Sequence, residues 1–252
     1  MTPVKVSIVN YTNTLPFRWA LKQWPLKYPT TISEDIPSEC ARKLLNGEVD
    51  LALVPVAIIN QLDSFEVISN WCIGANGKVD SVKLYAEVPV HQIKRVVLDY
   101  QSRTSVALTR VLLKEYWQHA VEFIPGYPGF ENAVSGDTAA VIIGDRTFAI
   151  NGQYAYEYDL AEAWKNHTGL PFVFAAWVSR THLPDAFVDE FNAVQASGIA
   201  NIREAIKASP PIKDYSESQV LEYLTQRISY ELDDSKTQAM FLFLEKLKIL
   251  GH

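Results

Sequence analysis

The sequence predicts an α/β protein arranged as two lobes, with mostly parallel sheets covered by helices. Three observations support this prediction. Strand-like and helix-like patterns alternate through about the first 175 residues, and after about residue 184 the apolar residues recur only at helical spacing. The alternation is also interrupted at two places, where the chain can cross from one lobe to the other.

Each element follows from its local pattern. The stretch 37–50 predicts a helix with Pro37 near its start and Gly47 just past its end, the usual placement of these residues. The strand-like runs are residues 4–11, 30–36, 51–59, 65–76, 81–88, 95–100, 121–127, 139–145 and 172–179. The helical patterns are residues 15–24, 37–50, about 102–116, 185–209, 216–232 and 236–250.

The interruptions define the expected lobes. One lies around 85–90, where AEVPVHQ breaks the pattern, and the other at 172–178, after the loop NHTGLP. Two crossings predict a discontinuous first lobe, residues 1–86 plus 178–252, and a continuous second lobe, residues 90–173. We expect an active-site cleft between them.

The composition excludes several classes of protein. The chain has 252 residues, 48% of them hydrophobic, and a net charge of −6 without a basic block, which argues against nucleic acid or an anionic membrane as the main partner. No run of about 18 apolar residues predicts a membrane-spanning helix, and the N-terminus lacks a signal-peptide pattern, so we expect a cytoplasmic protein. Cys40 and Cys72 fit no CxxC pattern and are expected to be free thiols, and no cluster predicts a metal site.

Polar residues gather where predicted strands end. In open α/β sheets ligands bind beyond the carboxyl ends of the strands, where helix N-termini point. Three such segments are Asn10–Thr14, Gln101–Ser105 and Gly144–Thr147, and a fourth, Gly77–Ser81, leads into a strand at a comparable place.

The segment Gln101–Ser105 is suited to an anion. Ser102 can cap the helix that follows, and the free N–H groups and the hydroxyls of Thr104 and Ser105 converge on one point. Arg103 adds a planar fork that suits a carboxylate. The alternative is ordinary capping with Arg103 in solvent.

The other candidates also have structural explanations. Asn13 can be a helix cap, Asp145 an N-cap, and Ser81 a strand-edge hydroxyl. The chain has no Walker loop, GxGxxG, HExxH or GxSxG motif. Of its five histidines only His167 could face a cleft, and the alternative for it is a place at a helix end. The site is therefore expected to consist of hydroxyls, amides, backbone N–H groups and one arginine.

Several motifs together resemble a known family. They are VSIVNYTNTLPF (6–17), LLNGEVDLALVPV (44–56), IGANGKVDSVKL (73–84), LDYQSRTSVALTRVLL (98–113), AAVIIGDRT (139–147) and YDLAEAWKNHTGLPFVFAAW (158–177). In this order they resemble the chorismate dehydratases of the futalosine route to menaquinone. The resemblance implies a type II periplasmic-binding-protein-like fold, two lobes with mixed sheets joined by a two-strand hinge.

The resemblance also implies an activity. The cleft would bind chorismate and eliminate water to give 3-[(1-carboxyvinyl)oxy]benzoate, without a cofactor. Asn13 matches the family's active-site asparagine, and Ser102 to Ser105 match its anion-binding turn. Ser81, Gly144 and Asp145 fall on other motifs that line the cleft.

The sequence leaves two questions open, namely which group acts as the base and whether the protein has another function. The base that removes the C3 proton is either the substrate's own enolpyruvyl carboxylate, oriented by Asn13, or Asp145. The alternative functions are a small-anion solute-binding or sensor protein of the same fold and the sister enzyme 1,4-dihydroxy-6-naphthoate synthase, which is expected to need a cleft histidine. A purely structural protein is disfavoured, because polar clusters at several strand ends have no packing use.

Overall fold

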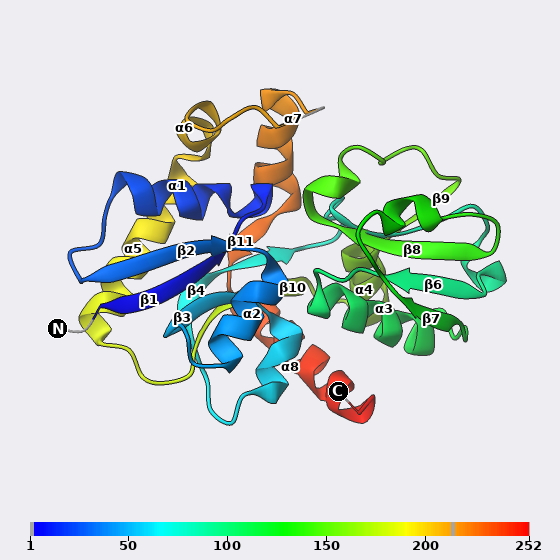
Figure 1. Cartoon of the computed structure of the whole chain (residues 1–252), viewed down its shortest axis with the longest axis horizontal. Helices are drawn as coiled ribbons and strands as arrows, with labels where there is room; N and C mark the ends of the chain where they lie inside the picture. Colours follow the sequence, from blue (N-terminus) through cyan, green and yellow to red (C-terminus); the bar gives the residue numbers. More distant parts are fainter. Residues whose placement is uncertain (1–2, 213–214, 252) are drawn as a thin grey trace.

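The chain folds into two sheets that lie side by side, each flanked by helices (Figure 1). The structure, a computed structural model, describes residues 3–212 and 215–251. The first sheet has the strand order β11-β4-β10-β3-β1-β2, and the second has the order β7-β6-β8-β5-β9. The second sheet lies in the green part of the chain on the right of Figure 1, and the C-terminal helices pack with the first sheet.

Most elements coincide with the predicted ones. The strands are β1 (Val4–Val9), β2 (Thr30–Asp35), β3 (Leu51–Pro55), β4 (Glu66–Ala75), β5 (Val82–Ala86), β6 (Arg95–Leu98), β7 (Glu122–Pro125), β8 (Thr138–Ile143), β9 (Tyr156–Asp159), β10 (Phe172–Ser179) and β11 (Ser229–Glu231). The α-helices are α1 (Leu15–Gln23), α2 (Pro37–Leu45), α3 (Arg103–Glu115), α4 (Leu160–Thr168), α5 (Asp185–Ala200), α6 (Ile202–Lys207), α7 (Glu217–Glu222) and α8 (Asp234–Ile249).

Short helical turns follow several strands. They are η1 (Thr12–Thr14), η2 (Val56–Gln61), η3 (Val90–Gln92), η4 (Phe130–Ala133) and η5 (Gly144–Thr147), and a π-helical turn, η6 (Tyr223–Arg227), follows α7. The strand β9, the helix α4 and the three-residue strand β11 were not among the predicted elements. β11 lies inside a helical apolar pattern and forms because it pairs with β4.

The sheets are mixed, as the family resemblance implied, and not mostly parallel as the alternation alone indicated. β1, β2 and β3 are parallel, as are β6, β7 and β8. β10 runs antiparallel to β3 and β4, and β5 runs antiparallel to β8 and β9. These two strands bring the chain into and out of the second sheet, so their direction is set by the crossings.

The strand pairing moves both crossings relative to the expected positions. All of β5 belongs to the second sheet, so the first crossing lies at 76–81 and not at 85–90. All of β10 belongs to the first sheet, so the return lies at 169–171. The break at Pro89 reads as a lobe boundary in the sequence, but it only begins the turn η3 between two strands of one sheet.

A continuous apolar core underlies both sheets. Every residue of β3 and β5 is buried, because each strand has a partner on both sides and helical cover. Cys40 and Cys72 are buried free thiols, as predicted, and burial raises the pKa of each to about 12. No helix among the described residues is long and apolar enough to cross a membrane.

Candidate active site between the two sheets

A pocket lies where the two sheets meet. Its empty volume is about 540 Å³ when the open mouth is included. Its lining residues are Val9, Tyr11, Asn13, Thr14, Pro37, Leu53, Pro55, Ile73, Val79, Ser81, Val82, Ser102, Thr104, Ser105, Ile143, Gly144, Phe174 and Ala175. None of these side chains carries a formal charge at neutral pH.

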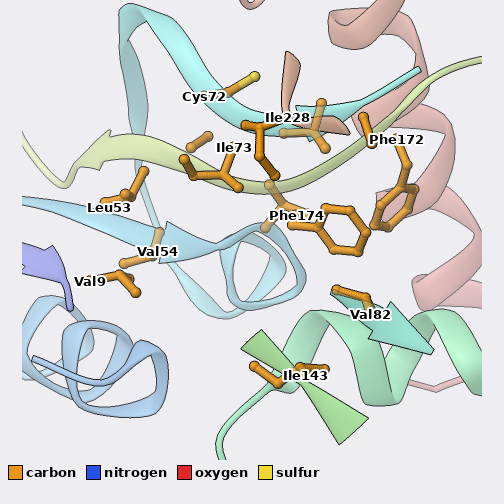
Figure 2. Close-up of a cluster of buried hydrophobic side chains, with 14 of the residues drawn as sticks. Val9, Leu53, Val54, Cys72, Ile73, Val82, Ile143, Phe172, Phe174 and Ile228 are labelled. Atoms are coloured by element: carbon orange, nitrogen blue, oxygen red, sulfur yellow. The ribbon is translucent and has the colours of Figure 1, made fainter. Parts of the chain in front are cut away.

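The apolar part of the wall is shared between the sheets. Figure 2 shows Val9, Leu53, Ile73 and Phe174 from the first sheet, and Val82 and Ile143 from the second, within one cluster of buried side chains. Such a wall excludes water and strengthens the polar contacts that a ligand makes inside.

Most of the polar part of the wall comes from segments that follow strands. Asn13 and Thr14 follow β1, Ser102, Thr104 and Ser105 follow β6, and Gly144 follows β8. The carboxyl ends of parallel strands meet at one edge of a sheet, and the facing edges of the two sheets bring these segments into one pocket.

The N-terminus of α3 forms a compact hydroxyl cluster. Ser102 is the N-cap, and its hydroxyl oxygen accepts a hydrogen bond from the Ser105 backbone N–H at 3.1 Å. The Ser102 hydroxyl also donates to Ser105 Oγ at 2.8 Å. The Thr104 hydroxyl accepts from the Ala57 N–H of the other lobe at 3.2 Å. The first N–H groups of α3 have no intrahelical partner, so this end of the helix is a ready anion site.

Arg103 does not belong to this cluster. Its side chain is exposed, and Nη1 donates to Gln61 Oε1 at 3.2 Å. Successive helical residues point about 100° apart, so when Ser102, Thr104 and Ser105 face the pocket, the residue at the first helical position turns outwards. The prediction of a guanidinium in the pocket is therefore wrong in this structure.

Asn13 presents an unpartnered oxygen. Its Oδ1 is buried and has no hydrogen-bond partner among the described residues. The side chain makes no capping bond to η1 or α1, so the helix-cap alternative is not realised. Its backbone carbonyl accepts from the hydroxyl of Tyr230 at 2.9 Å, which fixes the turn. A buried carbonyl oxygen without a partner is costly, and a ligand in the pocket could satisfy it.

Ser81 is held by its neighbours in the first crossing. Asp80 has the left-handed backbone angle φ of 61°, which is rare for a residue with a side chain. The buried carboxylate of Asp159 accepts from the N–H groups of Val79 and Asp80 at 2.9 and 2.7 Å. The Gly144 N–H donates to the Ser81 carbonyl at 2.8 Å. The crossing is thus fixed at the residue that enters the pocket.

Gly144 lets Tyr11 lie against the backbone. Its φ is +66°, and a Cβ there would lie 2.9 Å from the Tyr11 ring. Only glycine meets both demands without strain. The Tyr11 hydroxyl donates to Gln101 of the other lobe, and burial raises the pKa of this phenol well above its usual value.

Asp145 lies outside the pocket. Its two carboxylate oxygens accept from the Thr12 backbone N–H of the other lobe at 3.1 and 3.2 Å, and it does not line the cavity. It is not the N-cap of its own turn. Burial raises its pKa, and the Thr12 N–H opposes that rise. Asp145 therefore links the lobes behind the pocket.

Asp99, which was not among the predicted site residues, holds two walls of the pocket together. Its buried carboxylate accepts from the backbone N–H of Gln101 at 2.8 Å and of Ile143 at 3.2 Å, which ties the end of β6 to the end of β8. The guanidinium of Arg146 also donates to it. Burial raises the pKa of Asp99, and Arg146 opposes this. In the sequence, Asp99 could have been recognised as an acidic residue at the end of a buried strand.

His167 lies away from the pocket. It ends α4, with Nε2 at 3.4 Å from Glu115 Oε2 on α3 and its ring against Tyr116. Among residues 3–212 and 215–251, no histidine lines the pocket, and no group of three His, Cys, Asp or Glu side chains could hold a metal ion.

Sequence comparison places the chain in a family. The sequence profile described as menaquinone biosynthesis matches residues 4–248, nearly the whole chain. The chain belongs to this menaquinone-biosynthesis family. It is similar to a chorismate dehydratase from Thermus thermophilus, with 27% identity over 236 residues that cover 82% of each chain.

Solved structures confirm the predicted fold class for this menaquinone-biosynthesis protein. A protein from Archaeoglobus fulgidus covers 99% of the chain and 98% of its own, with a TM-score of 0.79 at 14% identity. The alkanesulfonate-binding protein SsuA from Xanthomonas axonopodis, bound to MOPS, has a TM-score of 0.64 at 12% identity, covering 100% and 93%. A Candida albicans protein described as having the generic periplasmic-binding-protein fold has a TM-score of 0.63 at 16% identity, covering 100% and 90%. At sequence identities this low, these similarities support the fold but not a function.

The lining residues determine which chemical steps the pocket of this menaquinone-biosynthesis protein can assist. Its described lining offers hydroxyls, one amide and helix N-termini, but no carboxylate or imidazole at which a base could act. It can bind and orient an anion, and it can stabilise charge that develops in a reaction.

Proposed function

We propose that this protein is a chorismate dehydratase, a hydro-lyase that converts chorismate into 3-[(1-carboxyvinyl)oxy]benzoate and water. The similarity to a chorismate dehydratase over 82% of the chain carries this proposal. The pocket supports it, because an uncharged polar wall with a helix N-terminus suits a small carboxylate substrate.

The reaction can proceed with a base that the substrate brings. The enolpyruvyl carboxylate takes the proton from C3, and the electron pair of the C3–H bond delocalises through the ring towards the ring carboxylate. The C4–O bond then breaks, and the departing hydroxyl takes up the proton to leave as water. The ring becomes aromatic, so the step is strongly downhill and a modest lowering of the barrier suffices.

The pocket residues have distinct roles in this scheme. The N-terminus of α3, with Ser102, Thr104 and Ser105, binds the ring carboxylate and stabilises the charge that reaches it. Asn13 orients the enolpyruvyl carboxylate or the departing hydroxyl, and Ser81 donates a hydrogen bond beside it. Gly144 shapes the wall against Tyr11.

The competing base is Asp145, which the substitution Asp145→Asn tests. Because Asp145 lies outside the pocket, we expect the Asp145→Asn variant to keep a kcat within about tenfold of the parent protein. A loss of more than about 100-fold in kcat with intact binding, in the range expected for removal of a general base, would make Asp145 the base.

The alternative functions are less well supported. The sister enzyme 1,4-dihydroxy-6-naphthoate synthase is expected to need a cleft histidine, and none lines the described pocket. A solute-binding or sensor protein would bind chorismate without changing it.

One assay separates these functions. Purified protein is mixed with chorismate, and the product is followed by absorbance and mass spectrometry. A dehydratase gives an aromatic product lighter than chorismate by one water. Bound but unchanged chorismate would support the solute-binding function, and no binding would overturn the proposal.

A further inference from the structure

We propose that Tyr223 is a positioning residue that sets the hydrogen-bond direction of Ser81 in the pocket. This inference rests on the proposed dehydratase function and extends its machinery to a C-terminal residue that does not line the pocket. No sequence motif singled out above includes Tyr223.

Tyr223 connects the C-terminal helices to the first crossing. It is the first residue of the π-helical turn between α7 and β11 and is 4% exposed. Its hydroxyl donates to Ser81 Oγ at 2.7 Å, a contact between residues 142 positions apart in the sequence. Four residues further on, Arg227 donates to the Asp80 carboxylate beside Ser81. Single π-helical turns often occur at functional sites.

The direction of the Tyr223 hydrogen bond determines what Ser81 can offer a ligand. Because the phenol donates to Ser81 Oγ, one lone pair of this oxygen is used and its own proton remains available. Among residues 3–212 and 215–251, the bond from Tyr223 is the one hydrogen bond that Ser81 Oγ makes. Ser81 therefore acts as a donor into the pocket.

Asn13 supplies the acceptor of the pocket. Its Oδ1 is buried and has no hydrogen-bond partner among the described residues, and Asn13 and Ser81 both line the pocket. Burial raises the pKa of Tyr223 far above its usual value, so the phenol stays protonated and remains a donor to Ser81.

The pocket wall therefore offers an acceptor, Asn13 Oδ1, and a donor, the Ser81 hydroxyl that Tyr223 orients. A leaving hydroxyl group needs both, since its hydrogen is donated and its oxygen gains charge as the C4–O bond breaks. Tyr223 keeps its own proton throughout, and water leaves with the proton taken from C3.

Other buried tyrosines show what an ordinary structural role looks like. Tyr85 is fully buried and donates to Asn151 Oδ1 at 2.6 Å, and neither residue lines the pocket. Tyr230 donates to a backbone carbonyl. Tyr223 differs from both because its partner is a side-chain hydroxyl in the pocket wall.

The test is the substitution Tyr223→Phe with Tyr85→Phe as the matched control. Both changes remove one buried phenol hydroxyl. We expect kcat for chorismate to fall about 10- to 100-fold in Tyr223→Phe with KM within about threefold, because the reacting group is misplaced while the carboxylate sites remain. Tyr85→Phe should keep kcat within about twofold.

A double-mutant cycle distinguishes positioning from a general structural effect. In a Ser81→Ala background, Tyr223→Phe should reduce kcat much less than in the parent protein, because its partner is already absent. Equal losses in both backgrounds, or an unchanged kcat in Tyr223→Phe, would overturn the role of Tyr223. If the parent protein does not convert chorismate, the proposed function fails, whereas an active parent with an active Tyr223→Phe variant refutes this inference alone.

Discussion

At the residue scale, the shape of the pocket depends on the missing side chain at position 144. Gly144 and Gly152 both have positive φ, at +66° and +83°. A Cβ at Gly144 would meet the Tyr11 ring at 2.9 Å, whereas one at Gly152 would meet nothing within 4 Å. Alanine substitutions at these two glycines therefore separate the cost of backbone strain from the cost of displacing Tyr11.

We expect Gly144→Ala to lower the free energy of unfolding by about 1–3 kcal/mol more than Gly152→Ala. Both variants carry the left-handed strain, but only the first displaces Tyr11. Urea denaturation measures the difference, and chorismate turnover should fall only in Gly144→Ala. Equal stabilities for the two variants would show that the Tyr11 contact is unimportant.

Titration provides a second test at this scale. Tyr11 is the titratable side chain in the described lining, and burial raises its pKa, so the phenol stays protonated well past pH 9. The substrate carboxylates are ionised above about pH 5. We therefore expect kcat to be flat between about pH 6 and 9. A rise or fall of kcat with a midpoint between about pH 6 and 9 would indicate that a group of the protein acts as an acid or a base.

Single residues show how far the sequence alone could lead. Asn13 and Ser102 were singled out as polar residues that follow predicted strands, and Ser81 as a polar residue that leads into one, and all three line the pocket. Arg103 was mistaken because its direction depends on the rotation of α3 about its axis, which spacing does not reveal. Asp145 faces a backbone N–H of the other lobe, and Tyr223 comes from a distant segment. Both contacts join segments that are far apart in the sequence, so the sequence alone does not reveal them.

At the scale of elements, the N-terminus of α3 is the proposed carboxylate site. Ser102 both caps the helix and lines the pocket, so two substitutions can separate these roles. Alanine removes the cap, whereas aspartate is as good a cap as serine but places a negative charge at the site.

We expect Ser102→Ala to cost about 1 kcal/mol of stability and Ser102→Asp to cost little. Both should raise KM for chorismate, and the aspartate should raise it by at least about tenfold, because like charges repel in a poorly solvated pocket. Denaturation and steady-state kinetics measure the two effects. An unchanged KM in Ser102→Asp would mean that no carboxylate binds at α3.

Elements with strong local signals were predictable, and those defined by pairing were not. Helices α2 and α3 begin and end within a few residues of their predicted limits, since proline, serine and apolar spacing mark them. The strand β11 is only three residues long and exists because β4 offers it an edge. The place of β5 in the second sheet also depends on its partners, so the first crossing was predicted too late in the chain.

At the scale of the whole molecule, the pocket exists only where the lobes meet. Hydrogen bonds join the lobes around it, between Thr12 and Asp145, Tyr11 and Gln101, Ala57 and Thr104, and Tyr223 and Ser81. A ligand held by Asn13 on one side and by the α3 N-terminus on the other would add to these links.

We therefore expect the product, 3-[(1-carboxyvinyl)oxy]benzoate, to stabilise both lobes together. At a free concentration of about 100 times its Kd, it should add about 2.7 kcal/mol to the free energy of unfolding. Differential scanning calorimetry should show the whole transition move to higher temperature. If only part of the transition moves, the ligand binds to one lobe alone.

The central claim is that the substrate supplies the base and the protein supplies an uncharged, oriented pocket. The most direct test is turnover, at saturating concentration, of a chorismate analogue whose ether carries a methyl group in place of the enolpyruvyl group. Our account predicts that this analogue binds through its ring carboxylate but loses no water at a measurable rate. Elimination at a rate comparable to that of chorismate would show that a group of the protein removes the C3 proton.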